Sequence, residues 1–284
     1  MEERARSALV FVPPLVIALL LGKPWLAVVV LVAAGLGALE ALRLLRAAGY
    51  PVQVALGVAI ALAIVLDAAV PVDLAGSAAL LVAVALILAA VGSFARRDPG
   101  DGLSCWLGTV FGGIYVGMLG FVVRLGNAAP DLPAGAPFAA VLDGERAWVL
   151  ILILSVWAYD TGAYLIGRTF GERFGEATGL TRFLTHISPS KTYAGLFGGL
   201  AATTIVLGLG LWAAGAPVWH ALIVGPAVGL AAQAGDLAES LLKRAAGAKD
   251  SSQLIPGHGG ILDRIDSFLF AAPVVTLYVL TFGR

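Results

Sequence analysis

Long apolar stretches, separated by short polar ones, follow one another along almost the whole chain. A transmembrane helix needs about 20 mostly apolar residues, and about nine stretches come near that length. They cover residues 8–22, 25–42, 52–70, 74–93, 103–124, 147–167, 194–213, 217–235 and 267–283. Their apolar residues do not alternate with polar ones, as in the roughly ten-residue strands of a membrane β-barrel. The pattern therefore predicts an all-α polytopic membrane protein with about nine transmembrane helices.

The first two stretches leave an alternative open. They are short and are joined only by Gly-Lys-Pro at residues 22–24, so they could form a single broken element. Pro13 and Pro14 predict a kink in the first stretch, because proline cannot donate a helical hydrogen bond. The basic start followed by an apolar run also resembles a signal peptide. No convincing cleavage site follows, and we expect a retained first span.

The composition agrees with a membrane protein. Hydrophobic residues make up 60% of the 284 residues and charged residues only 13%, about half of what a soluble domain carries. The formal net charge is zero, whereas a nucleic-acid-binding protein shows a basic excess, so we expect no nucleic-acid partner. Cys105 is the only cysteine, which excludes a disulfide within the chain.

The distribution of Lys and Arg predicts the orientation, because cytoplasmic loops of membrane proteins carry the excess of these residues. Threading nine spans from a cytoplasmic N-terminus leaves only Lys23, Arg124, Arg146 and Arg284 outside. The other fourteen then lie inside: Arg4, Arg6, Arg43, Arg46, Arg96, Arg97, Arg168, Arg173, Arg182, Lys191, Lys243, Arg244, Lys249 and Arg264. We therefore expect a multi-pass protein of the cell (inner) membrane with its N-terminus in the cytoplasm.

The chain divides into two predicted regions. Residues 1–125 hold about five spans with short loops, and residues 126–146 form a Pro-, Gly- and Ala-rich extracytoplasmic connection. Residues 147–284 hold about four spans and two long cytoplasmic loops, 168–193 and 236–266. Most candidate chemistry lies in or beside these two loops, so we expect the C-terminal region to be catalytic.

The first polar cluster surrounds Asp160, in "WAYDTGAYLIGRTFG". A lone charge within a span costs roughly 2.5–3.5 kcal/mol on insertion scales and should face a polar cavity or a partner. Trp157, Asp160, Thr161, Tyr164 and Arg168 recur at helical spacing and share one face. Asp160 therefore either lines a site, which we favour, or pairs with Arg168 or another cation to pack helices.

The second cluster is "ISPSKTYAG", residues 187–195. Ser188, Ser190 and Thr192 supply hydroxyl groups and Lys191 a positive charge, just before a predicted helix begins. Hydroxyls, a lysine and a helix N-terminus suit a phosphate group. The same residues also fit an ordinary polar turn at the start of a membrane helix, and the sequence alone leaves both interpretations open.

The third cluster extends over residues 233–267. Asp236, Glu239, Ser240 and Lys243 are spaced at i, i+3, i+4 and i+7, so they form a polar stripe on a helix that leaves the eighth span. The alternative is an ordinary solvated loop with juxtamembrane charges. Such a loop would not need the glycine-rich turn that follows.

That turn, "PGHGG", combines His258 with Gly259 and Gly260. Successive backbone N–H groups in a turn can hold an anion, and Asp263 and Asp266, three residues apart, project to one side of the next helix. Carboxylates beside such a turn suit Mg²⁺ and a polyphosphate, because Mg²⁺ prefers oxygen ligands and shares them with phosphates. His258 either donates to a phosphate oxygen or only shapes the turn.

The segment "SLLKRAAGAKDSSQLIPGHGGILDRID" resembles the signature of the phosphatidate cytidylyltransferases, also called CDP-diacylglycerol synthases. The stretches "DTGAY", "GRTFG" and "SPSKT" are also similar to that family, so the resemblance covers about residues 155–284 in detail. Ala194 departs from it, because the family often has an acidic or amide residue there. The matching signature residues are Ser240, Lys243, Arg244, Lys249, Asp250, Pro256, His258, Gly259, Gly260, Asp263, Arg264 and Asp266.

The resemblance implies that CTP and phosphatidic acid react to give CDP-diacylglycerol and pyrophosphate. It implies Mg²⁺ held by Asp236 and Asp263, and it also implies a homodimer. We add Asp266 as a metal ligand and leave open a second cation. Lys243 and Arg264 are assigned to catalysis beside the two aspartates. The predicted substrate-binding residues are Asp160, Ser188, Ser190, Lys191, Thr192, Ser240, Arg244, Lys249, Asp250, His258, Gly259 and Gly260.

A site at the inner membrane surface would meet CTP from the cytosol and the lipid from the bilayer. Two rival functions remain. A transporter would also combine many spans with intramembrane charge, but transporters often have paired broken helices in their two halves, and no such pair is evident. A CTP-dependent lipid kinase of the polyprenol type would transfer the γ-phosphate and release CDP instead of pyrophosphate.

Overall fold

A computed structural model describes residues 17–70, 77–254 and 259–283, and over these residues the chain is helical, with no β-strand. This confirms the predicted all-α class. The α-helices are α2 (Lys23–Ala47), α3 (Val54–Ala69), α4 (Ser77–Ser93), α5 (Pro99–Gly117), α6 (Gly120–Ala128), α7 (Gly144–Thr178), α8 (Tyr193–Ala213), α9 (Ala221–Ala245) and α10 (Leu262–Phe282). Two short 3₁₀ helices, η2 (Pro137–Ala140) and η3 (Val218–His220), precede α7 and α9.

Within the described residues, six helical segments are long and apolar enough to cross a membrane: α2, α5 with α6, α7, α8, η3 with α9, and α10. Two shorter apolar helices, Val54–Ala69 and Val82–Ser93, match the third and fourth predicted stretches. The first predicted stretch, 8–22, lies mostly outside the described residues. The protein is therefore a multi-pass membrane protein, while the predicted number of nine spans is not confirmed.

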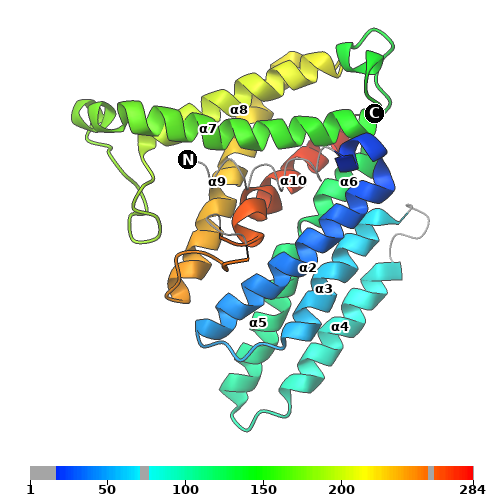
Figure 1. Ribbon diagram of the computed structural model, residues 1–284, viewed down its shortest axis with the longest axis vertical. Helices are drawn as coiled ribbons and strands as arrows, with labels where there is room; N and C mark the ends of the chain where they lie inside the picture. The colour runs from blue at the N-terminus through cyan, green and yellow to red at the C-terminus, as the bar shows by residue number, and fades with distance from the viewer. Residues whose placement is uncertain (1–16, 71–76, 255–258, 284) are drawn as a thin grey trace.

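The helices form two groups with α9 and α10 between them (Figure 1). Helices α2, α3, α4 and α5 pack side by side, and α7 packs along α8 across one end of the view. Helix α10 contacts α9, α6, α2 and α7. The central position of α10 matters because its first two turns carry three predicted site residues, Asp263, Arg264 and Asp266.

Helix α7 is much longer than its predicted span. Asp143 caps its start by accepting a hydrogen bond from the Arg146 backbone N–H at 2.9 Å, and Gly179, with a left-handed φ of 75°, ends it. Its 35 residues extend about 52 Å at 1.5 Å per residue, beyond the roughly 30 Å hydrocarbon core. The charged residues after position 167 mark where the helix leaves the apolar stretch, but the helix itself continues.

At both predicted cytoplasmic loops, the helix likewise continues beyond the end of the apolar stretch. Because α7 continues to Thr178, the connection before α8 is limited to residues 179–192. Because α9 continues to Ala245 and α10 begins at Leu262, the second connection is limited to residues 246–261. The loss of hydrophobicity therefore predicts a membrane boundary, whereas the helix ends at a glycine or a turn further along.

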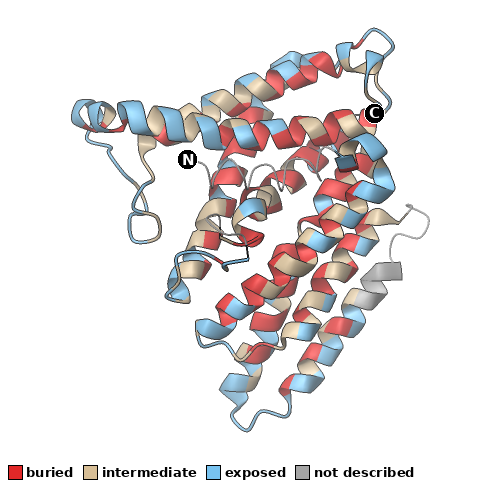
Figure 2. Ribbon diagram, viewed as in Figure 1, coloured by how far each residue is buried: buried red, intermediate tan, exposed pale blue. Residues whose placement is uncertain are grey.

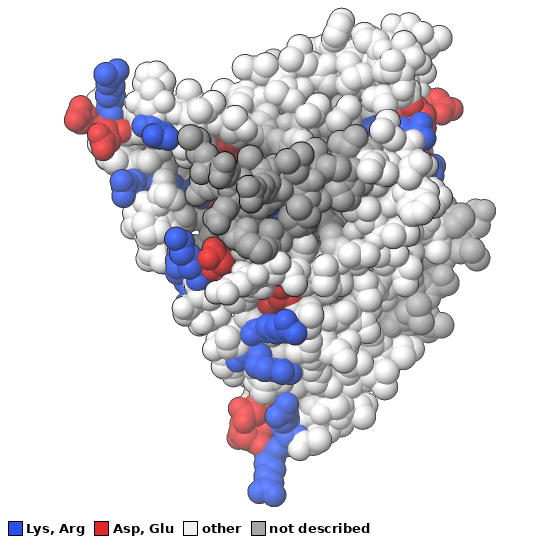
Figure 3. Space-filling view, in the orientation of Figure 1, with Lys and Arg blue, Asp and Glu red and all other residues white. Residues whose placement is uncertain are grey.

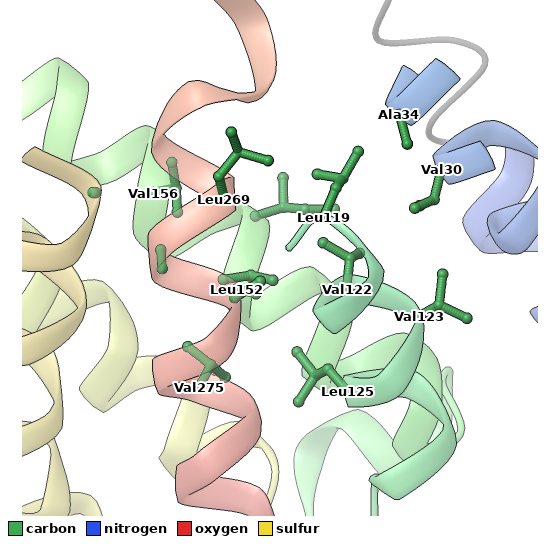
Figure 4. Close-up of a cluster of buried hydrophobic side chains, with 14 of the residues drawn as sticks. Val30, Ala34, Leu119, Val122, Val123, Leu125, Leu152, Val156, Leu269 and Val275 are labelled. Carbon is green, nitrogen blue, oxygen red and sulfur yellow. The ribbon is translucent and has the colours of Figure 1, made fainter. Parts of the chain in front are cut away.

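The apolar core joins the two groups of helices. Figure 4 shows Val30 from α2 and Val122 from α6 near Leu152 from α7 and Leu269 from α10. All four are buried within one continuous cluster. Burial is concentrated where the helices face one another, and many outward positions are exposed (Figure 2). Exposed apolar side chains such as Leu222 and Ile223 are those expected of a surface that contacts lipid.

Positive charge is concentrated at one end of the helices, which we call the cationic end: α2, α4, α7 and α9 finish there, and α3, α5, α8 and α10 begin there. Of the described Lys and Arg residues, only Lys23, Arg124 and Arg146 belong to the opposite end. In Figure 3 most visible Lys and Arg atoms lie along the left and lower edges, where Figure 1 places the cationic end. All predicted site residues that the structure describes lie in the half of the molecule toward this end, Asp160 at the middle of α7.

Candidate active site

Three helices bring five carboxylates near one another. Helix α9 carries Asp236 and Glu239, α10 carries Asp263 and Asp266, and α7 carries Asp160. Helices α9 and α10 approach closely because Gly235 has no side chain. A Cβ at that position would lie 2.3 Å from the Asp266 carbonyl oxygen. The close approach sets the polar stripe of α9 against the first turn of α10.

Asp263 is the most connected of these acids. Its Oδ1 accepts a hydrogen bond from Lys243 Nζ at 2.6 Å. Its Oδ2 accepts from Ser251 Oγ at 2.6 Å, from the Ser251 N–H at 3.0 Å and from the Gly260 N–H at 2.7 Å. The side chain is only 10% exposed. Asp263 therefore fixes both ends of the connection between α9 and α10, residues 246–261.

Lys243 joins Asp263 to Glu239. Its ammonium group lies 2.6 Å from Glu239 Oε2 as well as from Asp263 Oδ1. Glu239 is 1% exposed, and its other oxygen, Oε1, has no hydrogen-bond partner among the described residues. Lys243 thus neutralises two buried carboxylates and holds their helices together.

Asp236 belongs to a second polar group. It forms an ion pair with Lys191, which comes from the connection between α7 and α8. Gln233 Nε2 donates to Asp236 Oδ2 at 3.4 Å, and the Tyr159 hydroxyl donates to Gln233 Oε1 at 2.8 Å. The Lys191 and Asp236 side chains remain 25% and 28% exposed, so this pair can be reached from outside.

Asp160 and Asp266 complete the acidic cluster. Asp160 interacts electrostatically with Lys191, Asp236 and Arg264, and Asp266 with Asp236 and Asp160. The first interpretation of Asp160, that it lines a polar region, is compatible with these neighbours. Arg168 instead donates to the Tyr164 hydroxyl at 2.8 Å. Lys191 and Arg264 also fit the alternative, in which Asp160 pairs with another cation, so both interpretations stay open.

The "SPSKT" segment folds over this cluster. Thr192 caps α8 by accepting from the Gly195 N–H at 3.1 Å, Ser190 is exposed and Ser188 half-buried. Arg244 of α9 donates to the Ile187 carbonyl oxygen at 3.3 Å. Lys191 is thus the member of the segment that contacts an acidic residue of the cluster, and the predicted phosphate role of the hydroxyl groups stays a prediction.

The remaining predicted residues lie around the second connection. Lys249, Asp250 and Arg264 are exposed, and Ser240 is half-buried. Gly259 has a φ of +77°, in the left-handed region that favours glycine. His258, like Pro256, lies outside the described residues.

Sequence reasoning overlooked Glu40. This residue of α2 is 4% exposed, and it accepts hydrogen bonds from residues of the connection before α10 and of the first turn of α10. A lone acid in an apolar stretch was the signal that drew attention to Asp160, and the same signal marks Glu40. Arg43 follows closely and gives the position the look of an ordinary membrane boundary.

The donor set fits Mg²⁺ only in part. Among the described residues, no three His, Cys, Asp or Glu side chains are arranged to hold an ion. Mg²⁺ does not require such a group, because proteins often bind it through one or two carboxylates together with substrate phosphates. Asp236 accepts from Gln233 and pairs with Lys191 through Oδ2, and Asp266 accepts from the Ser267 N–H through Oδ1. Asp263, by contrast, already uses both oxygens.

The charge balance also favours a cation. Fully ionised, the five carboxylates exceed Lys191, Lys243 and Arg264 by two negative charges. Buried or half-buried charge of one sign is unfavourable unless it is offset. A divalent cation at Asp236 and Asp266 would offset this excess and stays a prediction, while the predicted metal role of Asp263 would require exchanging an existing donor.

Comparison with known proteins identifies the family. The model of the cytidylyltransferase family matches residues 2–282. The chain belongs to this family. The match extends over both the N-terminal helices and the region of the acidic cluster, whereas the resemblance of the signature covered only the C-terminal half in detail.

Three relatives illustrate the similarity, and each is named phosphatidate cytidylyltransferase. The protein of Synechocystis sp. is 38% identical over 187 residues, which cover 61% of this chain and 60% of the relative. That of Staphylococcus haemolyticus is 39% identical over 145 residues, or 50% and 52% of the two chains. That of Staphylococcus aureus (strain COL) is 41% identical over 135 residues, or 47% and 49%. The aligned parts thus span between about half and three-fifths of these relatives.

With the substrates proposed below, Lys191→Ala should raise the KM for CTP or for the lipid by roughly five- to thirtyfold, because one charge-assisted contact to a phosphate is worth about 1–2 kcal/mol. Initial rates at varied concentrations of each substrate measure this. Arg173→Ala, which removes an exposed charge of the same sign from α7, is the matched control. Unchanged KM values for both substrates would leave Lys191 only as the partner of Asp236.

Proposed function

We propose that this cytidylyltransferase-family protein transfers the cytidylyl group of CTP to phosphatidic acid, giving CDP-diacylglycerol and pyrophosphate for phospholipid biosynthesis. The observation that carries the proposal is the linked pair of ion clusters, Lys191 with Asp236 and Lys243 with Asp263. These clusters combine carboxylates, which can bind a phosphate-bound cation, with lysine ammonium groups, which can bind phosphates. The names of the relatives supply the substrate class.

The proposed reaction is a displacement at the α-phosphorus of CTP. An oxygen of the lipid phosphate forms a bond to this phosphorus, the bond from it to the bridging oxygen of the β-phosphate breaks, and pyrophosphate leaves with the electron pair. The attacking phosphate is already an anion near neutral pH and needs no strong base. Bringing two anions together is the main obstacle, so positioning and charge neutralisation should supply most of the rate.

The residues of the site suit these tasks. Lys191 and Arg264 interact electrostatically with Asp160 and can attract phosphate groups toward the cluster. Lys243 is held between two carboxylates, which fixes its position, and one of them, Asp263, also accepts from the Gly260 N–H. Asp236 and Asp266 would hold Mg²⁺, which when bound would neutralise negative charge on the phosphate oxygens. Asp263 would hold the turn beside them.

The location and assembly form part of the proposal. The excess of Lys and Arg at the cationic end favours a cytoplasmic position for that end in the inner membrane. CTP would then arrive from the cytosol and phosphatidic acid from the inner leaflet. A homodimer rests on the family resemblance, and cross-linking in native membranes followed by mass measurement tests it.

Product analysis tests the activity directly. Purified protein in mixed micelles is incubated with phosphatidic acid, Mg²⁺ and CTP labelled in the α- or γ-phosphate. We expect label from the α-position in the lipid and label from the γ-position in pyrophosphate. Label from the γ-position in the lipid, with release of CDP, would identify a lipid kinase. Unchanged substrates, with CTP- or lipid-dependent movement across vesicles, would identify a transporter. The metal requirement is tested by a parallel incubation with a chelator, which should abolish the activity, and by added Mg²⁺, which should restore it.

A further inference from the structure

Glu40 reaches from the N-terminal group of helices into the connection that carries the glycine-rich turn. Its Oε1 accepts from Ser252 Oγ at 2.6 Å and from the Ile261 N–H at 3.2 Å. Its Oε2 accepts from the Leu262 N–H at 2.8 Å and lies 3.2 Å from Ser251 Oγ. These donors come from residues 251–252 and 261–262, more than 200 residues further along the chain.

Glu40 and Asp263 hold this connection from two sides. Ser251 Oγ lies 2.6 Å from Asp263 and 3.2 Å from Glu40, and since a hydroxyl has one proton, it donates to Asp263 and approaches Glu40 more loosely. The Gly260 N–H donates to Asp263, and a Cβ on Gly260 would meet Glu40 Oε2 at 2.4 Å. Gly260 therefore leaves the space that the Glu40 carboxylate occupies.

The contact of Glu40 with the connection consists of hydrogen bonds to a charged group as well as packing. A buried carboxylate is tolerated only when several donors satisfy it, and Glu40 finds them in backbone and hydroxyl groups of the connection. Two of the donors, the Ile261 and Leu262 N–H groups, stand at the start of α10, where unpaired N–H groups attract negative charge. The position of α10, and with it the positions of Asp263 and Asp266, thus depends on a residue of α2.

We infer that Glu40 is a positioning residue for the proposed cytidylyl transfer, acting on the site through Ser251, Gly260 and Asp263 rather than by touching a substrate. The inference rests on the proposed function. It makes α2 part of the catalytic unit and gives the N-terminal region a role in the chemistry.

The test compares Glu40→Gln with a matched control. Glutamine keeps the size and one acceptor oxygen but loses the charge and turns an NH₂ group toward donors. The control is Glu145→Gln, the same change at a mostly buried acid that pairs with Lys23 at the opposite end. Ser252→Ala, which removes one donor to Glu40 without contacting Asp263, is the milder second variant.

Two readouts are measured on the full-length protein. We expect Glu40→Gln to lower kcat about tenfold with less than about a twofold change in the KM for CTP, because the site is misaligned rather than stripped of a substrate contact. Hydrogen exchange should become faster at the Ile261 and Leu262 amides. Ser252→Ala should shift both readouts in the same direction by a smaller amount, and Glu145→Gln should shift neither.

Faster exchange with an unchanged kcat would overturn the inference, because Glu40 would then hold the fold without positioning the site. Unchanged exchange and kcat in both Glu40→Gln and Ser252→Ala would overturn it as well. If Glu40→Gln does not fold, the Ser252→Ala result decides. An inactive wild-type protein in the product assay would instead refute the proposed function, and hydrogen exchange would still report separately whether Glu40 holds the connection.

Discussion

Asp263→Asn should lower CDP-diacylglycerol formation by roughly 10²- to 10³-fold while the protein still inserts and purifies as a folded species. The side chain is 10% exposed and accepts from Lys243, Ser251 and Gly260. Each 1.36 kcal/mol added to the reaction barrier lowers the rate tenfold, so the expected loss corresponds to about 2.7–4.1 kcal/mol from a misplaced Lys243 and a misplaced connection. Radiolabelled CTP incorporation into lipid measures the loss.

The amide cannot satisfy the site in either orientation. If its NH₂ group replaces Oδ2, it faces Ser251 and the Gly260 N–H, and both lose their acceptor. If it replaces Oδ1, it faces the Lys243 ammonium group, which then keeps only Glu239 as a partner. Both arrangements release the turn or Lys243, so the loss should appear mainly in kcat.

A titration with Mg²⁺, the proposed cofactor, tests which of two roles Asp263 has. A metal ligand replaced by an amide should raise the Mg²⁺ concentration needed for half-maximal rate, whereas a turn-holding residue should leave that concentration unchanged. Asp143→Asn is the matched control, because it makes the same change at the cap of α7 at the opposite end, where asparagine caps equally well. Wild-type activity in Asp263→Asn would remove this residue from the mechanism.

The sequence predicts the site best where residues are close along the chain. The stripe of Asp236, Glu239 and Lys243 and the pair of Asp263 and Asp266 follow from helical spacing, and the structure places both sets on facing helices. The link from Lys243 to Asp263 and the link from Lys191 to Asp236 could not be derived, because spacing does not tell which helices pack together. The pairing of Lys243 with Asp263 depends on the close approach of α9 and α10 at Gly235.

Contacts between the N-terminal and C-terminal regions could not be predicted from the sequence for the same reason. Nothing around Glu40 indicates that its donors stand at Ser252 and Leu262, and only the packing of α2 against α10 brings them together. Eight of the predicted apolar stretches correspond to described helices, with α5 and α6 sharing one stretch, but the sixth span was predicted to end at 167, whereas α7 ends at Thr178. A hydropathy pattern reports the solvent around a helix, and a charged helix continues outside the lipid until a residue such as Gly179 ends it.

Gly235→Ala should lower activity by about 10²-fold and lower the thermal stability of the purified protein. The new Cβ would lie 2.3 Å from the Asp266 carbonyl oxygen and 3.1 Å from the Ser267 Cα. Both are backbone atoms that cannot rotate away. Since real Cβ contacts essentially never fall below 3.0 Å, α9 and α10 must separate by at least about 0.7 Å, and displacements near 1 Å can cost 10²-fold in rate.

The higher helix propensity of alanine is too small to compensate for the clash between α9 and α10. Alanine is favoured over glycine in a helix by roughly 0.5–1 kcal/mol, whereas overpacking costs about 1–3 kcal/mol and occasionally more. The net change should therefore be destabilising, and the separation of α9 from α10 would also pull Lys243 away from Asp263. Activity assays and thermal denaturation in detergent measure the two effects.

Gly135→Ala provides the matched control, because a Cβ at Gly135 meets nothing within 4 Å and should leave both measurements close to wild type. Gly235→Ser should lower activity and thermal stability at least as much as Gly235→Ala, since the serine side chain begins with the same Cβ. If Gly235→Ala kept full activity, α9 and α10 could move apart without disturbing the acids between them. The dependence of catalysis on their close approach would then be wrong, even if Asp236 and Asp263 were each required.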